Sequence, residues 1–277
     1  MTAANETPAG EGRAVPGGER ASPSGAGPRR RPVTLITGGS RGIGAATAEL
    51  AARRGHDLIL AYHSDGASAQ AVAQRARADG ARVECVQVEV ADEASVLALF
   101  AHVDQSFGRL DGLVNNAGVL DRSQPFLEYS AERMQRIFQT NVFGAFIVAR
   151  EAARRMARSR GGAGGVMVNV SSAAARMGSP NEYIDYAASK GAMDSMTIGL
   201  AKELAGEGIR VNAVRPGLIH TDIHASGGRP GRVDELAHMV PLRRGGTAEE
   251  VANAIVWLLS DEASYVTGAL LDASGGR

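Results

Sequence analysis

The sequence has little of three features that each mark a class of protein. Its single cysteine, Cys85, excludes a disulfide bond within the chain. No apolar run reaches the roughly 18 residues needed to span a membrane. Neither charge sign is in excess, because Lys plus Arg and Asp plus Glu each number 30, so a nucleic-acid partner has no support. We expect no membrane association, no nucleic-acid binding and a cytoplasmic location.

The first 32 residues of the 277-residue chain also have almost no large apolar side chains. They are rich in Gly, Ala, Pro, Ser, Glu and Arg, so burial cannot offset the entropy of ordering them. We expect a disordered tail over residues 1–32. It has no apolar segment typical of a secretory signal, and its three glutamates argue against an organelle transit peptide. The basic cluster at residues 29–31 is either solvated or a weak contact for an anion.

From residue 33 onward, short apolar runs alternate with helical patterns. Strands are predicted over residues 33–37, 58–62, 82–90, 110–114, 166–170, 208–214 and 269–272. Helices are predicted over residues 45–54, 67–78, 130–158 and 186–207, after Asp92 as N-cap, and after a capping box at Thr247 to Glu250. This alternation predicts the α/β fold class, with residues 33–277 forming a single Rossmann-type domain around a doubly wound parallel sheet of about seven strands.

A glycine-rich turn joins the first predicted strand to the first predicted helix. It contains Gly38, Gly42 and Gly44. Glycine lets the backbone turn sharply and approach a ligand closely. The following helix offers free N–H groups and a positive dipole end to a pyrophosphate. The turn therefore predicts a dinucleotide site.

The second predicted strand ends in Tyr62, His63 and Ser64, without an acidic residue. In dinucleotide-binding folds an acid there binds the ribose 2′-hydroxyl of NAD, whereas basic residues suit the 2′-phosphate of NADP. Arg41, in the glycine turn, can reach the same pocket. NADP(H) is the favoured cofactor, with NAD(H) possible if Arg41 and His63 are only solvated.

Polar residues follow the later strands, where the carboxyl ends of a parallel sheet face a ligand. Residues 115–118 are Asn-Asn-Ala-Gly, and residues 171–172 are Ser-Ser. Asn141 lies in the apolar helix predicted over residues 130–158. It is either a paired core amide or a site residue, because an unpaired buried amide costs about 1–3 kcal/mol.

Tyr186 and Lys190 are four residues apart, so on a helix their side chains leave the same face. A nearby ammonium favours the phenolate of a tyrosine, which could then transfer a proton near neutral pH. The polar, Gly-rich residues 220–234 predict a mobile lid. Its Arg229 and Arg232 either favour an anionic substrate or are solvated.

Together these pieces resemble the short-chain dehydrogenase/reductase family over almost all of residues 33–276. Within the family the chain is similar to glucose-dehydrogenase-like and oxoacyl-reductase-like members. The matching motifs, in order, are Thr37-Gly38-x3-Gly42-x-Gly44, Asn115-Asn116-Ala117-Gly118, Asn141, Ser172, Tyr186-x3-Lys190, Pro216-Gly217 with Thr221, and Leu271-Asp272-Ala273-Ser274-Gly275-Gly276.

The resemblance implies an oxidoreductase that transfers hydride between a nicotinamide cofactor and a carbonyl compound or secondary alcohol. Its catalytic residues would be Tyr186 as general acid or base, Lys190 lowering the tyrosine pKa, Ser172 donating to the substrate oxygen, and Asn141 positioning a water. The implied cofactor-binding residues are Gly38, Ser40, Arg41, Gly42, Ile43, Gly44, His63, Ser64, Glu89, Val90, Asn116, Ala117, Gly118, Tyr186, Lys190, Pro216, Gly217, Ile219 and Thr221. A homotetramer (or dimer) and no metal ion are expected. The alternative is a nucleotide-binding sensor or scaffold without turnover.

Three features depart from the family pattern. Tyr186 follows Ser172 at a spacing one residue longer than usual. Either the loop carries one extra residue near Glu182, which we favour, or Ser171 and Ser172 have exchanged roles. Glu89 stands where an aspartate usually contacts adenine, and His63 replaces a common basic residue, so cofactor preference could be mixed or pH-dependent.

Overall fold

The computed structural model describes residues 30–277, and its compact unit runs from Arg31 to Arg277. The tail predicted over residues 1–32 lies outside the described residues up to residue 29. Arg31, predicted as solvated or an anion contact, instead packs against the domain. Its Nε donates to Asp57 Oδ1 at 3.1 Å, and its guanidinium also donates to the carbonyl oxygens of Ala52 and His56.

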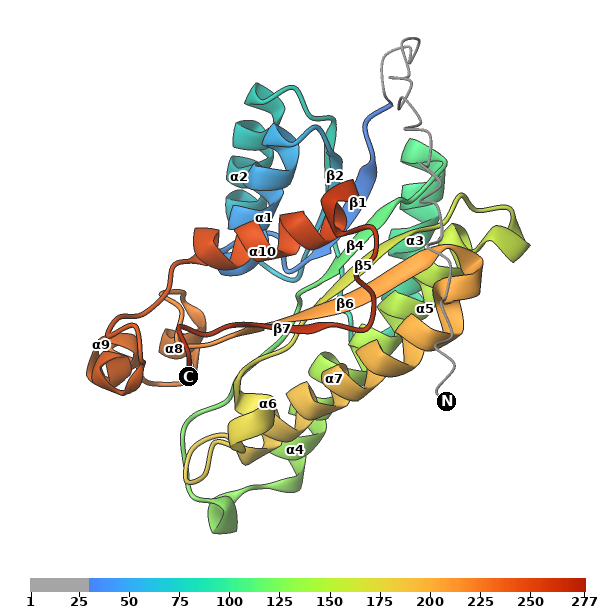
Figure 1. Cartoon of the computed structure of the whole chain (residues 1–277). Coiled ribbons are helices and arrows are strands. Elements are labelled where there is room, and N and C mark those ends of the chain that lie inside the picture. The colour runs from blue at the N-terminus through green and yellow to red at the C-terminus, as the bar shows by residue number, and fades with distance from the viewer. Residues whose placement is uncertain (1–29) are drawn as a thin grey trace, which may run out of the picture. The chain divides into compact units, whose positions relative to one another are not determined.

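A seven-stranded parallel sheet forms the centre of the fold, in the order β3-β2-β1-β4-β5-β6-β7 (Figure 1). The order reverses between β1 and β4, and ligands bind at such a switch point, beyond the carboxyl ends of the strands. The fold class and all seven predicted strands are confirmed. The strands are β1 Val33–Thr37, β2 Asp57–Tyr62, β3 Val83–Gln87, β4 Gly112–Asn115, β5 Gly165–Val170, β6 Ile209–Pro216 and β7 Leu270–Ala273.

Helices cover both faces of the sheet, which explains why the strands are apolar runs without alternation. On one face α1, α2 and α10 pack through residues such as Ala48, Val72 and Ile255. On the other face α3, α5 and α7 pack through residues such as Phe100 and Val148 (Figure 1). The helices are α1 Gly42–Arg53, α2 Gly66–Ala78, α3 Glu93–Phe107, α4 Ala131–Phe138, α5 Ala145–Met156, α6 Ala174–Met177, α7 Ile184–Leu204, α8 Ile223–Ser226, α9 Arg232–Leu236 and α10 Ala248–Leu259.

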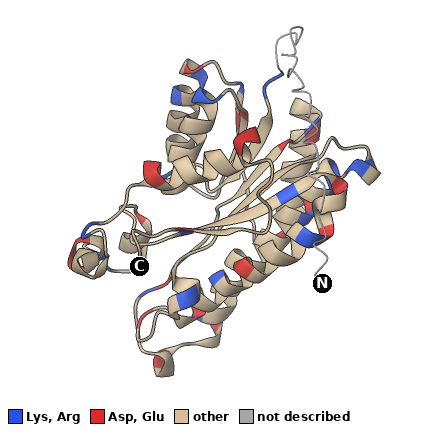
Figure 2. Ribbon diagram, in the orientation of Figure 1, with Lys and Arg blue, Asp and Glu red and all other residues tan. Residues whose placement is uncertain are grey.

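Two predicted caps are confirmed. Asp92 accepts a hydrogen bond from Ala94 N at the start of α3, and Thr247 with Glu250 forms a capping box on α10. Basic and acidic residues are interspersed along the elements (Figure 2). Within residues 30–277, no helix combines the length and apolarity of a membrane span.

Several predicted elements differ from the structure. The strand predicted over residues 82–90 ends at Gln87, because its neighbour β2 ends at Tyr62 and supplies its last carbonyl to Val88 N. The helix predicted over residues 130–158 is interrupted by a π-helical segment, Gln139–Gly144. Tyr186 does not open its helix, since α7 begins at Ile184. The predicted lid over residues 220–234 contains α8 and the first part of α9.

Candidate active site

One cavity of about 540 Å³ lies at the carboxyl ends of the strands. The glycine turn, the ends of β2, β4, β5 and β6, the start of α7 and several residues of the predicted lid all contribute to it. Every predicted site residue lines it except Gly44 and Asn141, which contact residues that do. Residues far apart in the sequence therefore come together here as the strand-end pattern predicts.

The glycine turn is closed tightly against the end of β4. Asn116 Nδ2 donates to the carbonyl oxygens of Thr37 and Gly38, at 2.9 and 3.1 Å. A Cβ on Gly44 would lie 2.1 Å from Gly38 O, so only glycine fits there. Helix α1 begins at Gly42, whose φ is +54°, and it carries no acidic residue in its first turn. This leaves free N–H groups and a positive helix end beside the cavity, which fits the phosphates of a dinucleotide.

The end of the cavity beside β2 holds both acidic and basic groups. His63 Nε2 lies 2.9 Å from Glu89 Oε2, and both side chains are exposed. Arg41 is exposed as well, and Asp65 lines the cavity while it caps α2 through Ser68 N. Sequence reasoning placed His63 and Glu89 separately and did not predict that they pair.

Asn141 and Lys190 lie together behind Gly118. A Cβ built on Gly118 would be 3.4 Å from both Asn141 Oδ1 and Lys190 Nζ. The Lys190 ammonium donates to Val170 O at 2.8 Å. Asn141 is fully paired, since it exchanges two hydrogen bonds with the Val119 backbone and donates to Ser189 Oγ at 3.1 Å. It is therefore both a paired core amide and a neighbour of the site.

The two adjacent serines have different surroundings. Ser171 is buried and its hydroxyl donates to Lys190 O at 3.1 Å, so it ties β5 to α7. Both serines line the cavity, but it is the Ser172 hydroxyl that accepts from Ala174 N at 3.1 Å and lies close enough to Tyr186 to favour its phenolate. This arrangement supports Ser172 as the residue that faces a substrate.

The expected lowering of the Tyr186 pKa by Lys190 is not seen in the protein alone. Burial raises the pKa of the Tyr186 phenol, and the Ser172 hydroxyl and Arg232 oppose this only in part. The Lys190 ammonium lies 5.6 Å from the centre of the Tyr186 ring and is directed to Val170 O. Burial also lowers the pKa of Lys190 to about 8, although Asp194 acts in the opposite direction.

The lid arginines are paired rather than free. Glu182 Oε2 accepts from Arg232 at 2.6 Å, and the other oxygen of the same carboxylate pairs with Arg229. Arg229 also pairs with Glu235 at 2.5 Å. The charge that hinted at an anionic substrate is thus balanced within the lid and the loop before α7.

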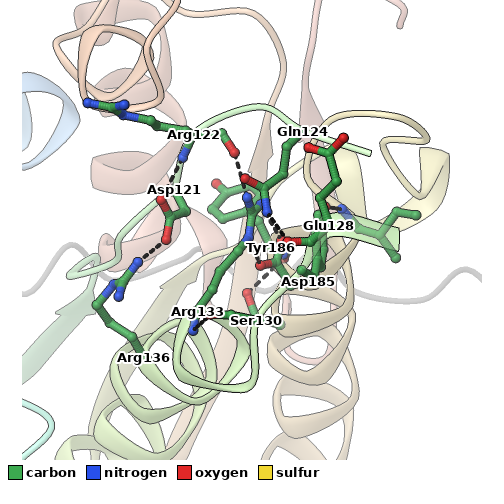
Figure 3. A network of polar contacts seen from close by, with 12 residues as sticks. Asp121, Arg122, Gln124, Glu128, Ser130, Arg133, Arg136, Asp185 and Tyr186 are labelled. Atoms are coloured by element: carbon green, nitrogen blue, oxygen red, sulfur yellow. Dashed lines mark hydrogen bonds and ion pairs between the residues drawn. The ribbon is translucent and has the colours of Figure 1, made fainter. Parts of the chain in front are cut away.

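Sequence reasoning missed an ion pair at the start of α7. Arg133, from α4, donates from two nitrogens to the two carboxylate oxygens of Asp185, at 2.6 and 3.1 Å (Figure 3). The side chains are only 6% and 2% exposed. The partners are 52 positions apart in the sequence, so no local pattern reveals them.

Comparisons with known proteins agree with this geometry. The protein family described as "Enoyl-(Acyl carrier protein) reductase" matches residues 38–277. The chain is 52% identical to "Uncharacterized oxidoreductase YgfF" of Escherichia coli over 245 residues, which are 88% of this chain and 99% of the relative. It is 35% identical to "Glucose 1-dehydrogenase 2" of Bacillus subtilis over 244 residues, 88% of this chain and 93% of the relative.

A solved structure gives the same result for the fold. The crystal structure of a short-chain type dehydrogenase/reductase from Mycobacterium marinum superposes with a TM-score of 0.82 at 32% identity. The match covers 88% of this chain and 94% of that one.

Proposed function

The chain belongs to the short-chain dehydrogenase/reductase family and is an oxidoreductase, and on this basis we propose that it reduces a carbonyl group, or oxidises a secondary alcohol, with a nicotinamide cofactor. The observation that carries the proposal is the convergence of Ser172, Tyr186 and Lys190 on one cavity at the switch point of the sheet. A nicotinamide dinucleotide would supply or accept the hydride when bound. Family membership favours this reading over a sensor without turnover.

The proposed roles follow from the position of each side chain. Tyr186 gives its phenolic proton to the carbonyl oxygen in reduction, and Ser172 donates a hydrogen bond to the same oxygen as charge develops on it. Lys190, fixed by Val170 O, holds a positive charge behind Tyr186. Because burial raises the pKa of Tyr186, the phenol stays protonated at neutral pH, which suits reduction.

For the cofactor we propose a preference for NADP(H). The end of β2 supplies His63 and no acid, and Arg41 lies exposed in the glycine turn. Glu89 and Asp65 in the same cavity work against the preference, so we expect it to be moderate. A comparison of kcat/KM for NADPH and NADH tests it, and a higher value with NADH would contradict it.

Purified protein incubated with NADPH and a panel of ketones, aldehydes and oxoacyl thioesters tests the proposed reaction. We expect NADPH absorbance to fall with at least one carbonyl compound. Tight NADPH binding without turnover on any of them would overturn the proposal. The homotetramer (or dimer) rests on the resemblance and the cytoplasmic location on the sequence composition, and light scattering and cell fractionation test them.

A further inference from the structure

Helix α7 begins without the side-chain cap that a helix start usually has. Its N-cap residue, Tyr183, makes no capping hydrogen bond. The first N–H groups of a helix have no partner within the helix and need other acceptors. Tyr186 is the third residue of α7, so the proposed acid lies in the turn that such acceptors have to hold.

Two side chains supply these acceptors. Asp185 Oδ1 accepts from Tyr186 N at 2.9 Å. The hydroxyl oxygen of Tyr129 accepts from Ile184 N at 2.9 Å and donates to Glu182 O at 3.1 Å. The backbone before and after the helix start is therefore held by the side chains of Tyr129 and Asp185, and not by the backbone hydrogen bonds of the helix itself.

Arg133 holds both of these side chains in place. It binds the Asp185 carboxylate at two points and its guanidinium lies 3.9 Å from the centre of the Tyr129 ring. Its remaining terminal nitrogen donates to Arg122 O at 2.6 Å (Figure 3). A two-point contact between a guanidinium and a carboxylate fixes orientation as well as distance. These residues form a cluster of Arg122, Tyr129, Arg133 and Asp185. The cluster connects α4, the segment after β4 and the first turn of α7.

We propose that Asp185, oriented by Arg133, is a positioning residue for the reaction, and that it sets where the Tyr186 hydroxyl meets the substrate. This rests on the proposed function, because it assumes that Tyr186 transfers the proton. Misplacing a reacting group by about 1 Å can lower a rate on the order of 100-fold. A pair whose only role was to hold the fold would affect stability and leave kcat of the folded enzyme unchanged.

The variants Asp185→Asn and Arg133→Lys test the proposal. The second keeps a positive charge and removes the two-point contact. Asp104→Asn is the control for the two-point geometry, since Asp104, which is more exposed than Asp185, accepts from two nitrogens of Arg155 at 2.8 and 2.7 Å, away from α7. Each protein is measured at a temperature where circular dichroism shows it folded. The readouts are kcat with the best carbonyl substrate, the Kd for NADPH, and amide hydrogen exchange at residues 184–187.

We expect Asp185→Asn and Arg133→Lys each to lose kcat by about 10- to 100-fold, with the Kd for NADPH within about twofold of wild type. Exchange at residues 184–187 should rise, and Asp104→Asn should change none of the three. A folded Asp185→Asn or Arg133→Lys enzyme with wild-type kcat would overturn the proposal, as would unchanged exchange at residues 184–187. If Asp185→Asn does not fold, Arg133→Lys decides alone. Absence of turnover in the wild type would instead overturn the proposed function, and hydrogen exchange would still test the cluster.

Discussion

The side-chain amide of Asn141 makes two hydrogen bonds to the backbone of Val119, one as acceptor and one as donor. Neighbouring strands pair in this way, although neither residue lies in a strand. Asn141 Oδ1 accepts from Val119 N at 2.7 Å, and Asn141 Nδ2 donates to Val119 O at 2.9 Å. The pair fastens the segment after β4 to the π-helical segment. It lies beside Lys190, since a Cβ on Gly118 would be 3.4 Å from both Asn141 Oδ1 and Lys190 Nζ.

Replacing Asn141 with Leu should destabilise the protein and reduce turnover. The change leaves both backbone groups of Val119 without their partner, and each unpaired buried group costs about 1–3 kcal/mol. We expect the free energy of unfolding to fall by roughly 2–5 kcal/mol, as measured by urea denaturation. Asn253→Ala, at an exposed position of α10, is the control. Wild-type stability in Asn141→Leu would show that the Val119 contact contributes little.

Tyr186→Phe should remove most of the turnover and leave cofactor binding near wild type. The change deletes only the hydroxyl, and a general acid typically contributes about 10²–10⁴-fold to the rate. Steady-state kinetics and NADPH titration separate the two effects. Tyr265→Phe, at a fully exposed residue, should change neither. Substantial turnover in Tyr186→Phe would refute the acid role.

Substitutions of the two serines should also have different effects, one mainly on turnover and the other mainly on stability. Ser172→Ala should lower kcat by about 10²-fold or more, because a hydrogen-bond donor to the developing oxyanion is lost. Ser171→Ala should lower the unfolding free energy by about 1 kcal/mol through loss of the bond to Lys190 O, with a smaller effect on kcat. Kinetics and thermal unfolding of both variants provide the comparison. The opposite ranking would mean that the serines have exchanged roles.

Stability should rise with pH through the titration of Lys190. Its pKa is lowered from 10.5 to about 8, so between about pH 8 and pH 10.5 the unfolded chain binds more protons than the native protein. The free energy of unfolding therefore rises across this window, by roughly 3 kcal/mol from this group. Below about pH 8 both states carry the proton and the contribution is flat.

Urea denaturation of wild type and Lys190→Met from pH 7.5 to pH 10.5 isolates that contribution. The difference in unfolding free energy between wild type and Lys190→Met should increase with pH by roughly 3 kcal/mol across this window. Lys202→Met, at an exposed residue, should leave the pH dependence unchanged. A difference between wild type and Lys190→Met that stays constant with pH would contradict the lowered pKa.

Much of the fold was predictable because its signals are local. Apolar runs such as residues 33–37 mark strands buried on both faces, and the glycines at 38, 42 and 44 mark the turn that must approach a ligand. Tyr186 and Lys190 share a helix face by their spacing alone. Ser172 and Asn116 each follow a predicted strand, so the predicted parallel sheet is enough to bring them to the same cavity.

The remainder depends on contacts that no local pattern carries. Arg133 and Asp185 become partners only after α4 and α7 pack together. The sequence predicts that Lys190 favours a phenolate, but burial of Tyr186 dominates its pKa in the protein alone. The apolar spacing of residues 130–158 does not reveal the π segment, because one extra residue in a turn leaves the pattern on either side intact.

The π segment also makes the length of this helix critical. An α-helix turns by about 100° per residue, and a π segment holds one residue more than the α-helical span it replaces. Deleting a single residue from Gln139–Gly144 would restore regular winding and leave α4 and α5 in nearly the same rotation, because the wider turn is what takes up the extra residue. Arg133 would stay beside Asp185. Asn141 lies within the wider turn, so its amide would shift relative to Val119. The helix would then be more regular, and the wall of the cavity would lose the side chain that fastens it.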